Sequence, residues 1–177
     1  MIYNKVLNIC SPELESVREI YENSFPVDER RDWSLMLELI SCNDAFILEA
    51  ICREDSVVGM LSWWQLDGWR FVEHFAIDTS CRGRGIGREV LQEFLLRSKL
   101  PVVLEVEPPT DYYSRRRIAF YQSEGFVLHD TYRHIQPSYG EGREAIELFL
   151  MTYATPLGCN LDSLSGMLHS RVYGVEW

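Results

Sequence analysis

The chain has 177 residues, of which 46% are hydrophobic, 25% charged and 12% aromatic. This is an ordinary globular composition, and the length predicts a single domain over residues 1–177. With 17 basic and 27 acidic residues, the net charge is −10. Such a surface repels phosphate backbones and anionic lipid, so we expect no nucleic-acid or membrane partner. If the charge does more than keep the protein soluble, it favours cationic small molecules or peptides.

The sequence shows no feature of a membrane protein, a secreted framework or a metal site. No stretch approaches the roughly 20 apolar residues of a membrane span, and residues 1–15 lack the basic and apolar segments of a signal peptide. The five cysteines form no CxxC pair, and the four histidines lack metal-ligand spacing. We therefore expect a cytoplasmic protein with reduced thiols and no metal.

The first part of the chain predicts two helices and then three strands. Ser11–Leu14 is typical of a helix start, with a serine cap and a proline in first position, and this helix should end near Asn23. Asp32 is expected to cap a second helix. Strand-forming apolar runs follow at Ala45–Cys52, Val57–Gln65 and Trp69–Ile77. Asp67-Gly68 is a strong hairpin signal, so the three strands predict an antiparallel meander.

The second part alternates helices and strands. Apolar residues at helical spacing predict a helix from Ile86, and Ser114 is expected to cap another that ends at a left-handed Gly125. Further strands are expected at Pro101–Val106, Phe126–Arg133 and Glu144–Thr152, and a short helix at Asn160–His169. This order predicts an α/β (α+β) fold, a mixed sheet with helices on its faces.

A glycine-rich loop, Arg82–Gly87, stands between a predicted strand and a predicted helix. Glycines let the backbone approach a phosphate, and the free N–H groups of the first helical turn point at it. The arginines of this stretch, with Arg88, add positive charge to an acidic protein. No Gly-Lys-Ser/Thr follows, so this is not a Walker loop, and the G-x-G-x-G spacing after antiparallel strands fits a dinucleotide-binding oxidoreductase poorly. The alternative is a tight turn with solvated arginines.

Together with a second motif, this loop resembles the GNAT family of acyl-CoA-dependent N-acetyltransferases. Glu73–Asp78 followed by Arg82–Gly87 is similar to the family's strand 4 and its R-x-x-G-x-G loop. Arg116–Phe126 is similar to the family's fourth helix, which ends F-Y-x-x-x-G-F. The resemblance covers residues 1–153 and leaves 154–177 as a C-terminal extension. It implies a largely antiparallel central sheet in which strands 4 and 5 splay apart to form a cleft.

The resemblance implies acetyl-CoA as the cosubstrate. The loop amides would bind the coenzyme A pyrophosphate, and the exposed backbone of strand 4 would bind the pantetheine arm. The residues implied for coenzyme binding are Ile77, Asp78, Arg82, Gly83, Arg84, Gly85, Ile86, Gly87, Arg88 and Ser114. The family's fourth helix often opens N-x-x-A, whereas this chain has Ser114 and Arg117, so the coenzyme contacts there are expected to differ.

The resemblance also implies a catalytic acid and base. Tyr121 matches the family tyrosine that protonates the leaving thiolate, and a phenol is a suitable donor because its pKa lies near or above that of a thiol. Glu73 stands where members often carry a catalytic Glu or His. Strand alternation places it between Phe71 and Phe75, with His74 on the other face, which predicts a raised pKa and a base acting directly or through water. The alternatives are a packed tyrosine and a salt-bridged glutamate.

Four residues are expected to bind the acceptor. Glu29 and Arg30 fall where the family's helix 1–2 region shapes the substrate pocket, and Glu105 and Tyr139 complete the set. For Glu105 the alternatives of a solvated or an arginine-paired side chain stay open, and for Glu107 they are preferred. An acidic and aromatic pocket would suit a cationic amine.

The predicted function is transfer of an acetyl group to a primary amine of a small molecule or peptide, by direct attack in a ternary complex. The enzyme would be a monomer or a homodimer. The alternative is a non-enzymatic acyl-CoA-binding sensor or interaction protein. The C-terminal extension could dock on the sheet, cover the acceptor site or contact a second subunit.

Overall fold

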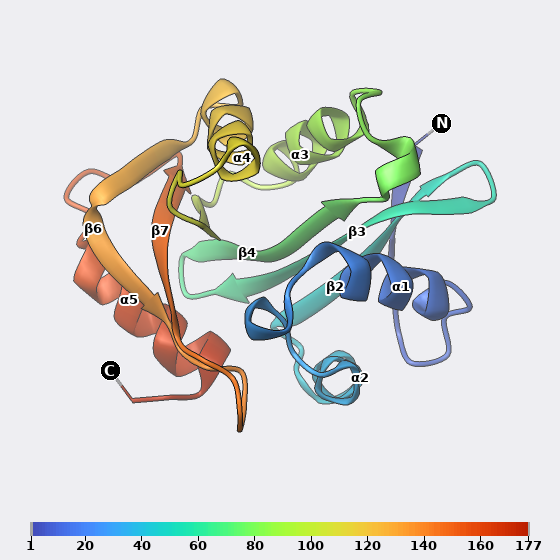
Figure 1. Ribbon diagram of the computed structural model, residues 1–177, viewed down its shortest axis with the longest axis horizontal. Coiled ribbons are helices and arrows are strands. Elements are labelled where there is room, and N and C mark those ends of the chain that lie inside the picture. Colours follow the sequence, from blue (N-terminus) through green and yellow to red (C-terminus); the bar gives the residue numbers. More distant parts are fainter. Residues whose placement is uncertain (1, 177) are drawn as a thin grey trace. The chain divides into compact units, whose positions relative to one another are not determined.

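Two compact units make up the computed structural model, which describes residues 2–176 (Figure 1). The first unit contains the chain through Gln65 together with Val72–Lys99, and the second contains Leu66–Phe71 and the chain from Leu100 onward. Met1 and Trp177, the ends of the predicted single domain, lie outside the described residues. Each unit combines antiparallel strands with helices, so the predicted mixed and largely antiparallel α/β fold is confirmed.

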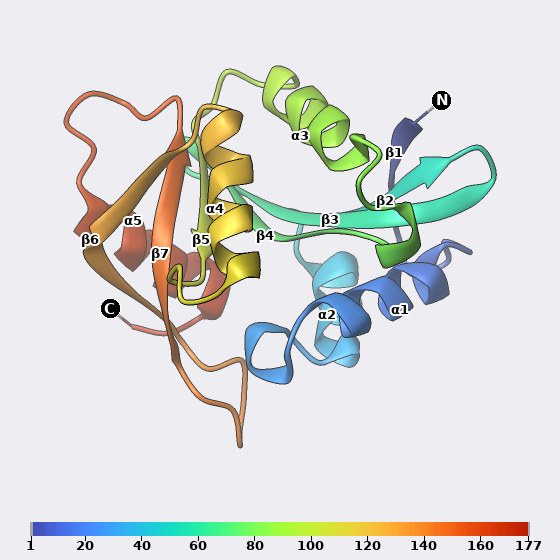
Figure 2. The ribbon, with the colours of Figure 1, turned by 45° about the horizontal axis from the view of Figure 1, so that its top comes forward.

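The first unit is built on a meander. Its elements are β1 (Ile2–Val6), α1 (Leu14–Ser24), α2 (Trp33–Cys42), β2 (Phe46–Arg53), α3 (Ile86–Leu96) and most of β3 (Ser56–Leu66) and β4 (Trp69–Ile77), with 3-10 turns at Val27–Glu29 and Thr79–Cys81. β1 pairs antiparallel with β2, and β2 with β3, while β4 lies beside β3. Figure 2 shows α3 on one face of these strands and α1 and α2 on the other. β1 adds to the predicted elements; it is a short, half-exposed strand without a long apolar run.

The second unit has three strands in the order β5-β7-β6. Its elements are β5 (Val102–Val106), α4 (Tyr112–Ser123), β6 (Val127–Gln136), β7 (Ile146–Tyr153), α5 (Leu161–Leu168) and a π-helix, His169–Tyr173. Both strand pairs are antiparallel, and the register of β6 against β7 shifts between His129 and His134. Figure 2 shows α4 and α5 on opposite faces of these strands. The C-terminal extension therefore docks on the sheet, one of the alternatives that the sequence left open.

Two helices begin at positions other than those predicted. The Ser11 hydroxyl accepts the Asn8 amide at 2.9 Å instead of capping α1, which starts at Leu14. α4 starts two residues before Ser114, because Asp111 is its cap. The Asp111 carboxylate accepts the Ser114 amide at 2.8 Å, and the Ser114 hydroxyl accepts the Asp111 amide at 3.1 Å. This reciprocal pair satisfies two amides of the first turn, which favours the earlier start.

Gly59 in β3 lies where the neighbouring strand leaves no space for a side chain. A Cβ at this position would stand 2.6 Å from the Ala76 carbonyl oxygen and 2.8 Å from Cδ1 of Ile77. The first of these atoms is backbone, so it cannot turn aside. Glycine at position 59 thus permits the close approach of the end of β4, the segment that leads into the glycine-rich loop.

We expect Gly59→Ala to lower the free energy of unfolding by about 1–3 kcal/mol, because the added methyl overpacks against backbone. Urea unfolding followed by circular dichroism measures the change. Gly87→Ala is the matched control. Gly87 lies within α3, and its added Cβ would meet Ile77 at an ordinary 3.5 Å. Because alanine favours a helix more than glycine does, that variant should be as stable as the wild type or up to about 1 kcal/mol more stable. Equal stability of the two variants would contradict the account of Gly59.

Candidate functional site

The glycine-rich loop connects the end of β4 to the first turn of α3. Gly83 and Gly85 both have left-handed backbones, with φ of +78° and +80°, and Gly85 is the cap residue of α3. A Cβ at either position would meet nothing within 4 Å, so the space over the loop is open. The first N–H groups of a helix have no acceptor within it, which makes this turn an anion-binding arrangement.

Ile86 anchors the loop in the core of the first unit. Its side chain is buried with Ile51, Val58 and Val90. Only its backbone remains for a ligand, which fits the expectation that the loop binds through amides. Arg84 and Arg88 are exposed and stand on either side of Ile86 in the sequence, so they place positive charge around the first turn of α3.

The entry to the loop is held by two polar side chains. Arg82 donates from Nε to the carbonyl oxygen of Ile77 at 2.8 Å. The Asp78 carboxylate accepts from the hydroxyl and from the amide of Ser80, and these hydrogen bonds lower its pKa. Two of the residues predicted to bind the coenzyme therefore also fix the path of the chain between β4 and α3.

The Glu73 carboxylate lies in a polar cluster of the first unit, with its side chain only 1% exposed. It accepts hydrogen bonds from Arg31 Nε at 3.0 Å and from Trp64 Nε1 at 2.8 Å, and Arg31 Nη2 lies 2.8 Å away. Strand alternation predicts Glu73 and His74 on opposite faces. Both nevertheless contact the segment before α2, Glu73 through the Arg31 side chain and His74 through the Glu29 carbonyl.

The predicted rise in the pKa of Glu73 is wrong. Burial does raise its pKa, but the nearby charges of Arg31 and His74 and the hydrogen bond from Trp64 outweigh burial and bring the pKa below its ordinary value of 4.5. The flanking phenylalanines are visible in the local pattern, whereas Arg31 is 42 residues away. The sequence therefore revealed the burial and missed the ion pair.

The segment between α1 and α2, residues 25–32, contains the two residues of the first unit that were expected to bind the acceptor. The Glu29 carbonyl lies 3.0 Å from Nε2 of His74, whose Nδ1 is 3.1 Å from the Ser62 hydroxyl. Arg30 lies 3.7 Å from Glu22 of α1. Glu29 and Arg30 directly precede Arg31, and this segment contacts Glu73 and His74 of β4.

In the second unit, Glu105 is part of a buried hydrogen-bonded chain. His134 donates from Nε2 to one carboxylate oxygen at 2.5 Å, and the Tyr173 hydroxyl donates to the other at 2.6 Å. On the far side of the imidazole, Nδ1 lies 2.7 Å from the Ser165 hydroxyl. The ring of Tyr139 lies 5.5 Å from that of Tyr173. The structure therefore places Glu105 and Tyr139, two predicted acceptor residues, against the C-terminal segment.

Tyr121 is buried on α4 between aromatic neighbours. Its ring lies 5.2 Å from Phe120 and 5.5 Å from Phe126. Burial raises the pKa of Tyr121 to about 12, although nearby Arg117 lowers it. The hydroxyl therefore keeps its proton throughout the neutral range.

Ser114 and Arg117, which depart from the family's N-x-x-A pattern, both have partners close to them in the structure. The Ser114 hydroxyl is committed to Asp111, as described for the start of α4, and its side chain is buried. Arg117 pairs with Glu107 at 2.5 Å. This ion pair is the outcome that the sequence analysis preferred for Glu107.

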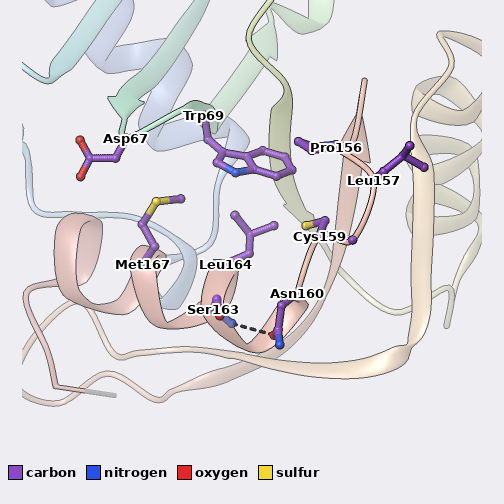
Figure 3. A pocket seen from close by; sticks show the side chains of 10 residues that line it. Asp67, Trp69, Pro156, Leu157, Cys159, Asn160, Ser163, Leu164 and Met167 are labelled. Carbon is purple, nitrogen blue, oxygen red and sulfur yellow. Dashed lines mark hydrogen bonds between the residues drawn. The ribbon is translucent and has the colours of Figure 1, made fainter.

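A pocket of about 310 Å³ opens in the second unit beside α5 (Figure 3). Its walls are largely apolar, and its one carboxylate, Asp67, lies 3.1 Å from Arg171. No predicted site residue lines it. Among residues 2–176, no three His, Cys, Asp or Glu side chains gather in a way that could hold a metal ion. The same part of the chain contains no helix that is long and apolar enough to span a membrane.

Comparisons with known proteins decide the family. The model of the acetyltransferase (GNAT) family matches residues 14–126. A solved GNAT-family protein of Bacteroides thetaiotaomicron is 30% identical, with a TM-score of 0.91 over 98% of this chain and 99% of that chain. The chain belongs to the GNAT acetyltransferase family. Among proteins of curated function, the comparison found no match.

More distant GNAT structures share the fold. NAA60 of Arabidopsis thaliana, solved in complex with acetyl-CoA, is 16% identical, with a TM-score of 0.64 over 86% of this chain and 98% of that chain. A GNAT acetyltransferase of Elizabethkingia anophelis, solved with acetyl-CoA bound, is 15% identical, with a TM-score of 0.58 over 86% and 97%. The resemblance stated from the two motifs is confirmed, and the family-model match contains both of them.

Several functional candidates of this GNAT chain were invisible to sequence reasoning. Arg31 directly follows the predicted Arg30, and only the fold shows that it is the partner of Glu73. His134 and Tyr173 lie 29 and 68 residues from Glu105 and carry no local motif. Each is found only through a long-range contact with a predicted glutamate.

We expect the stability that Glu73 provides to depend on pH. Because its folded-state pKa lies below the ordinary 4.5, the stabilisation is complete above that value and is lost as the pH falls through the folded-state pKa. The difference in unfolding free energy between wild type and Glu73→Gln should therefore shrink below about pH 4.5. Urea unfolding between pH 7 and pH 3 measures it, and a pH-independent difference would show that the carboxylate is not stabilised by its ion pair.

Removing the charge of Arg31 tests the same ion pair, with an exposed arginine as the control. Arg31→Gln leaves a buried carboxylate without its cation and should cost about 3–5 kcal/mol at pH 7. Arg18→Gln removes an exposed partner of Glu22 and should cost less than about 1 kcal/mol.

Proposed function

We propose that this GNAT chain transfers an acetyl group from acetyl-CoA to a primary amine of a small molecule or peptide, by direct attack in a ternary complex. The observation that carries the proposal is the geometry of the loop before α3. Two left-handed glycines leave its surface open, and the first N–H groups of α3 have no acceptor within the helix itself. A pyrophosphate needs such donors close to the backbone.

In this proposal, some loop residues bind the pyrophosphate and others fix the shape of the loop. Gly83, Gly85 and the backbone of Ile86 would hold the pyrophosphate, with the charges of Arg84 and Arg88 beside them. Arg82 and Asp78 would fix the loop in shape. Ile77 at the end of β4 and Asp78 just after it are partly exposed, and their backbone would bind the pantetheine arm.

The amine must lose a proton before it attacks the thioester. Glu73 is our proposed acceptor for that proton through water, and its lowered pKa keeps it ionised at neutral pH. A base with a low pKa binds a proton weakly, so water must carry the proton onward. Tyr121 is the proposed donor to the departing thiolate, since burial keeps its hydroxyl protonated.

The non-enzymatic alternative makes a different prediction for the same loop. An acyl-CoA sensor would bind the coenzyme and turn over no amine. A panel of amines tested with acetyl-CoA, with release of free thiol as the readout, separates the two functions.

We expect saturable acetyl-CoA binding with micromolar affinity in calorimetric titration, with NADH as the control ligand. Gly85→Val should abolish it, because a β-branched residue does not adopt the left-handed backbone and the first-turn amides would turn away. Gly68→Val is the matched control: Gly68 has φ of +77° and equally open space, but stands in the β3–β4 hairpin. Loss of binding in both variants, or in neither, would refute the role of the loop.

Replacing Tyr121 by Phe should lower turnover with the best amine of the panel by about 10²-fold, within the usual range for a positioned acid. Acetyl-CoA affinity should change little. Tyr113→Phe, an exposed tyrosine on the same helix, is the control and should turn over at the wild-type rate. Unchanged turnover of Tyr121→Phe at saturating substrates would remove Tyr121 from the mechanism.

A further inference from the structure

One side chain covers both acceptor residues predicted in the second unit. The Tyr173 hydroxyl binds one carboxylate oxygen of Glu105, and the Tyr173 ring packs on that of Tyr139. The Glu105 side chain is 7% exposed and Tyr139 is 9% exposed. These two residues come from β5 and from the loop after β6, yet they share this neighbour. Tyr173 therefore contacts both residues at once, and a ligand that binds both in its place must displace it.

The other side of Glu105 is fixed. His134 is fully buried on β6, and its second ring nitrogen is held by the equally buried Ser165 of α5. To replace His134, a ligand would have to separate α5 from the strands. The carboxylate is therefore held permanently from one side.

Tyr173 is held less firmly. It is the last residue of a five-residue π-helix, a geometry that occurs mostly in single turns and often at functional sites. Gly174 follows with a left-handed backbone. The nearby pair of Arg171 and Asp67 is exposed and contributes little. Tyr173 itself is partly exposed, whereas its neighbour Val172 is buried.

We propose that Tyr173 occupies the place of the acceptor's ammonium group, and that Glu105 and Tyr139 form the subsite that a cationic amine enters by displacing it. A carboxylate oxygen that loses its donor inside the protein is costly, so the displacing group must donate in its place. An ammonium group does so with a charge-assisted bond, roughly twice as strong as that of a neutral hydroxyl. The face of Tyr139 adds cation–π attraction, and the net charge of −10 attracts cations.

This inference rests on the proposed function, because it names the class of acceptor that the enzyme captures before deprotonation. It selects cationic amines over neutral molecules of the same size. It also gives the C-terminal segment a role in specificity, since the competing hydroxyl comes from its last turn.

Calorimetric titration with butane-1,4-diamine, and with butane-1,4-diol as the neutral probe, tests the proposal on the full chain. Tyr173→Phe keeps the ring and removes the competing hydroxyl, so it should bind the diamine about fivefold more tightly than wild type. The double variant Glu105→Gln/Tyr173→Phe should lose that gain. Tyr112→Phe, an exposed tyrosine of α4, should bind as wild type does, and the diol should bind none of the proteins.

Diamine binding by Tyr173→Phe that is equal to or weaker than that of wild type would overturn the proposal, as would equal binding of the diol. A merely structural hydroxyl would lower the melting temperature without raising affinity for the cation. Where the variant does not fold, wild type labelled with ¹³C-tyrosine replaces it, and a Tyr173 ring signal that is unmoved by diamine overturns the proposal.

Acetyl-CoA titration of the same proteins separates this proposal from the proposed function. Acetyl-CoA binding without any diamine binding refutes the subsite and leaves the acetyltransferase proposal standing. Diamine binding with the predicted pattern, without acetyl-CoA binding, supports the cation subsite and refutes the transfer reaction.

Discussion

A carboxyl group that leaves water must be given hydrogen-bond donors, and in this acidic chain that requirement ties distant segments together. Glu49, Glu73 and Glu105 have nearly buried side chains on β2, β4 and β5. Their donors are Asn4, Trp63 and Arg97 for Glu49, Arg31 and Trp64 for Glu73, and His134 and Tyr173 for Glu105. Each buried acid thus fixes a neighbouring helix, loop or strand, and two of the predicted site residues, Glu73 and Glu105, are positioned by these contacts.

The same chain can hold a phosphate without a basic surface. Its net charge of −10 would repel an anion, but the donors at the start of α3 are backbone amides, which need no cationic side chain. Left-handed glycines expose those amides, and Ile86 anchors the turn in the core. The exposed Arg84 and Arg88 then add positive charge beside the first turn of α3. Backbone geometry therefore offers an anion-binding arrangement within a surface that otherwise favours cations.

Local chemistry explains what the sequence could predict. The hairpin glycine Gly68, the helix-ending Gly125 and the loop before α3 each follow from residues within a few positions. Gly125 has the left-handed backbone that was expected of it. The cap of α4 was misjudged by the same reasoning, because Asp111 and Ser114 are both good caps and only their reciprocal bonding decides between them.

The environments of the predicted glutamates could not be read in this way, because they depend on partners far along the chain. For Glu73 the local pattern showed the burial and hid Arg31, so even the direction of its pKa shift was wrong. For Glu105 the pattern left solvation and pairing with an arginine open, and the structure shows neither, but a hydrogen-bonded chain into the C-terminal segment.

The difference between these two acids has a functional consequence. Arg31 is permanently charged, so the charge of Glu73 is compensated within the protein and an incoming cation gains little there. One partner of Glu105 is the neutral hydroxyl of Tyr173, which a charged donor can outcompete. A buried acid with a neutral, peripheral partner is thus the better place to recognise an ammonium group. The contact that joins Tyr173 to β5 is then also the contact that we propose an acceptor exchanges.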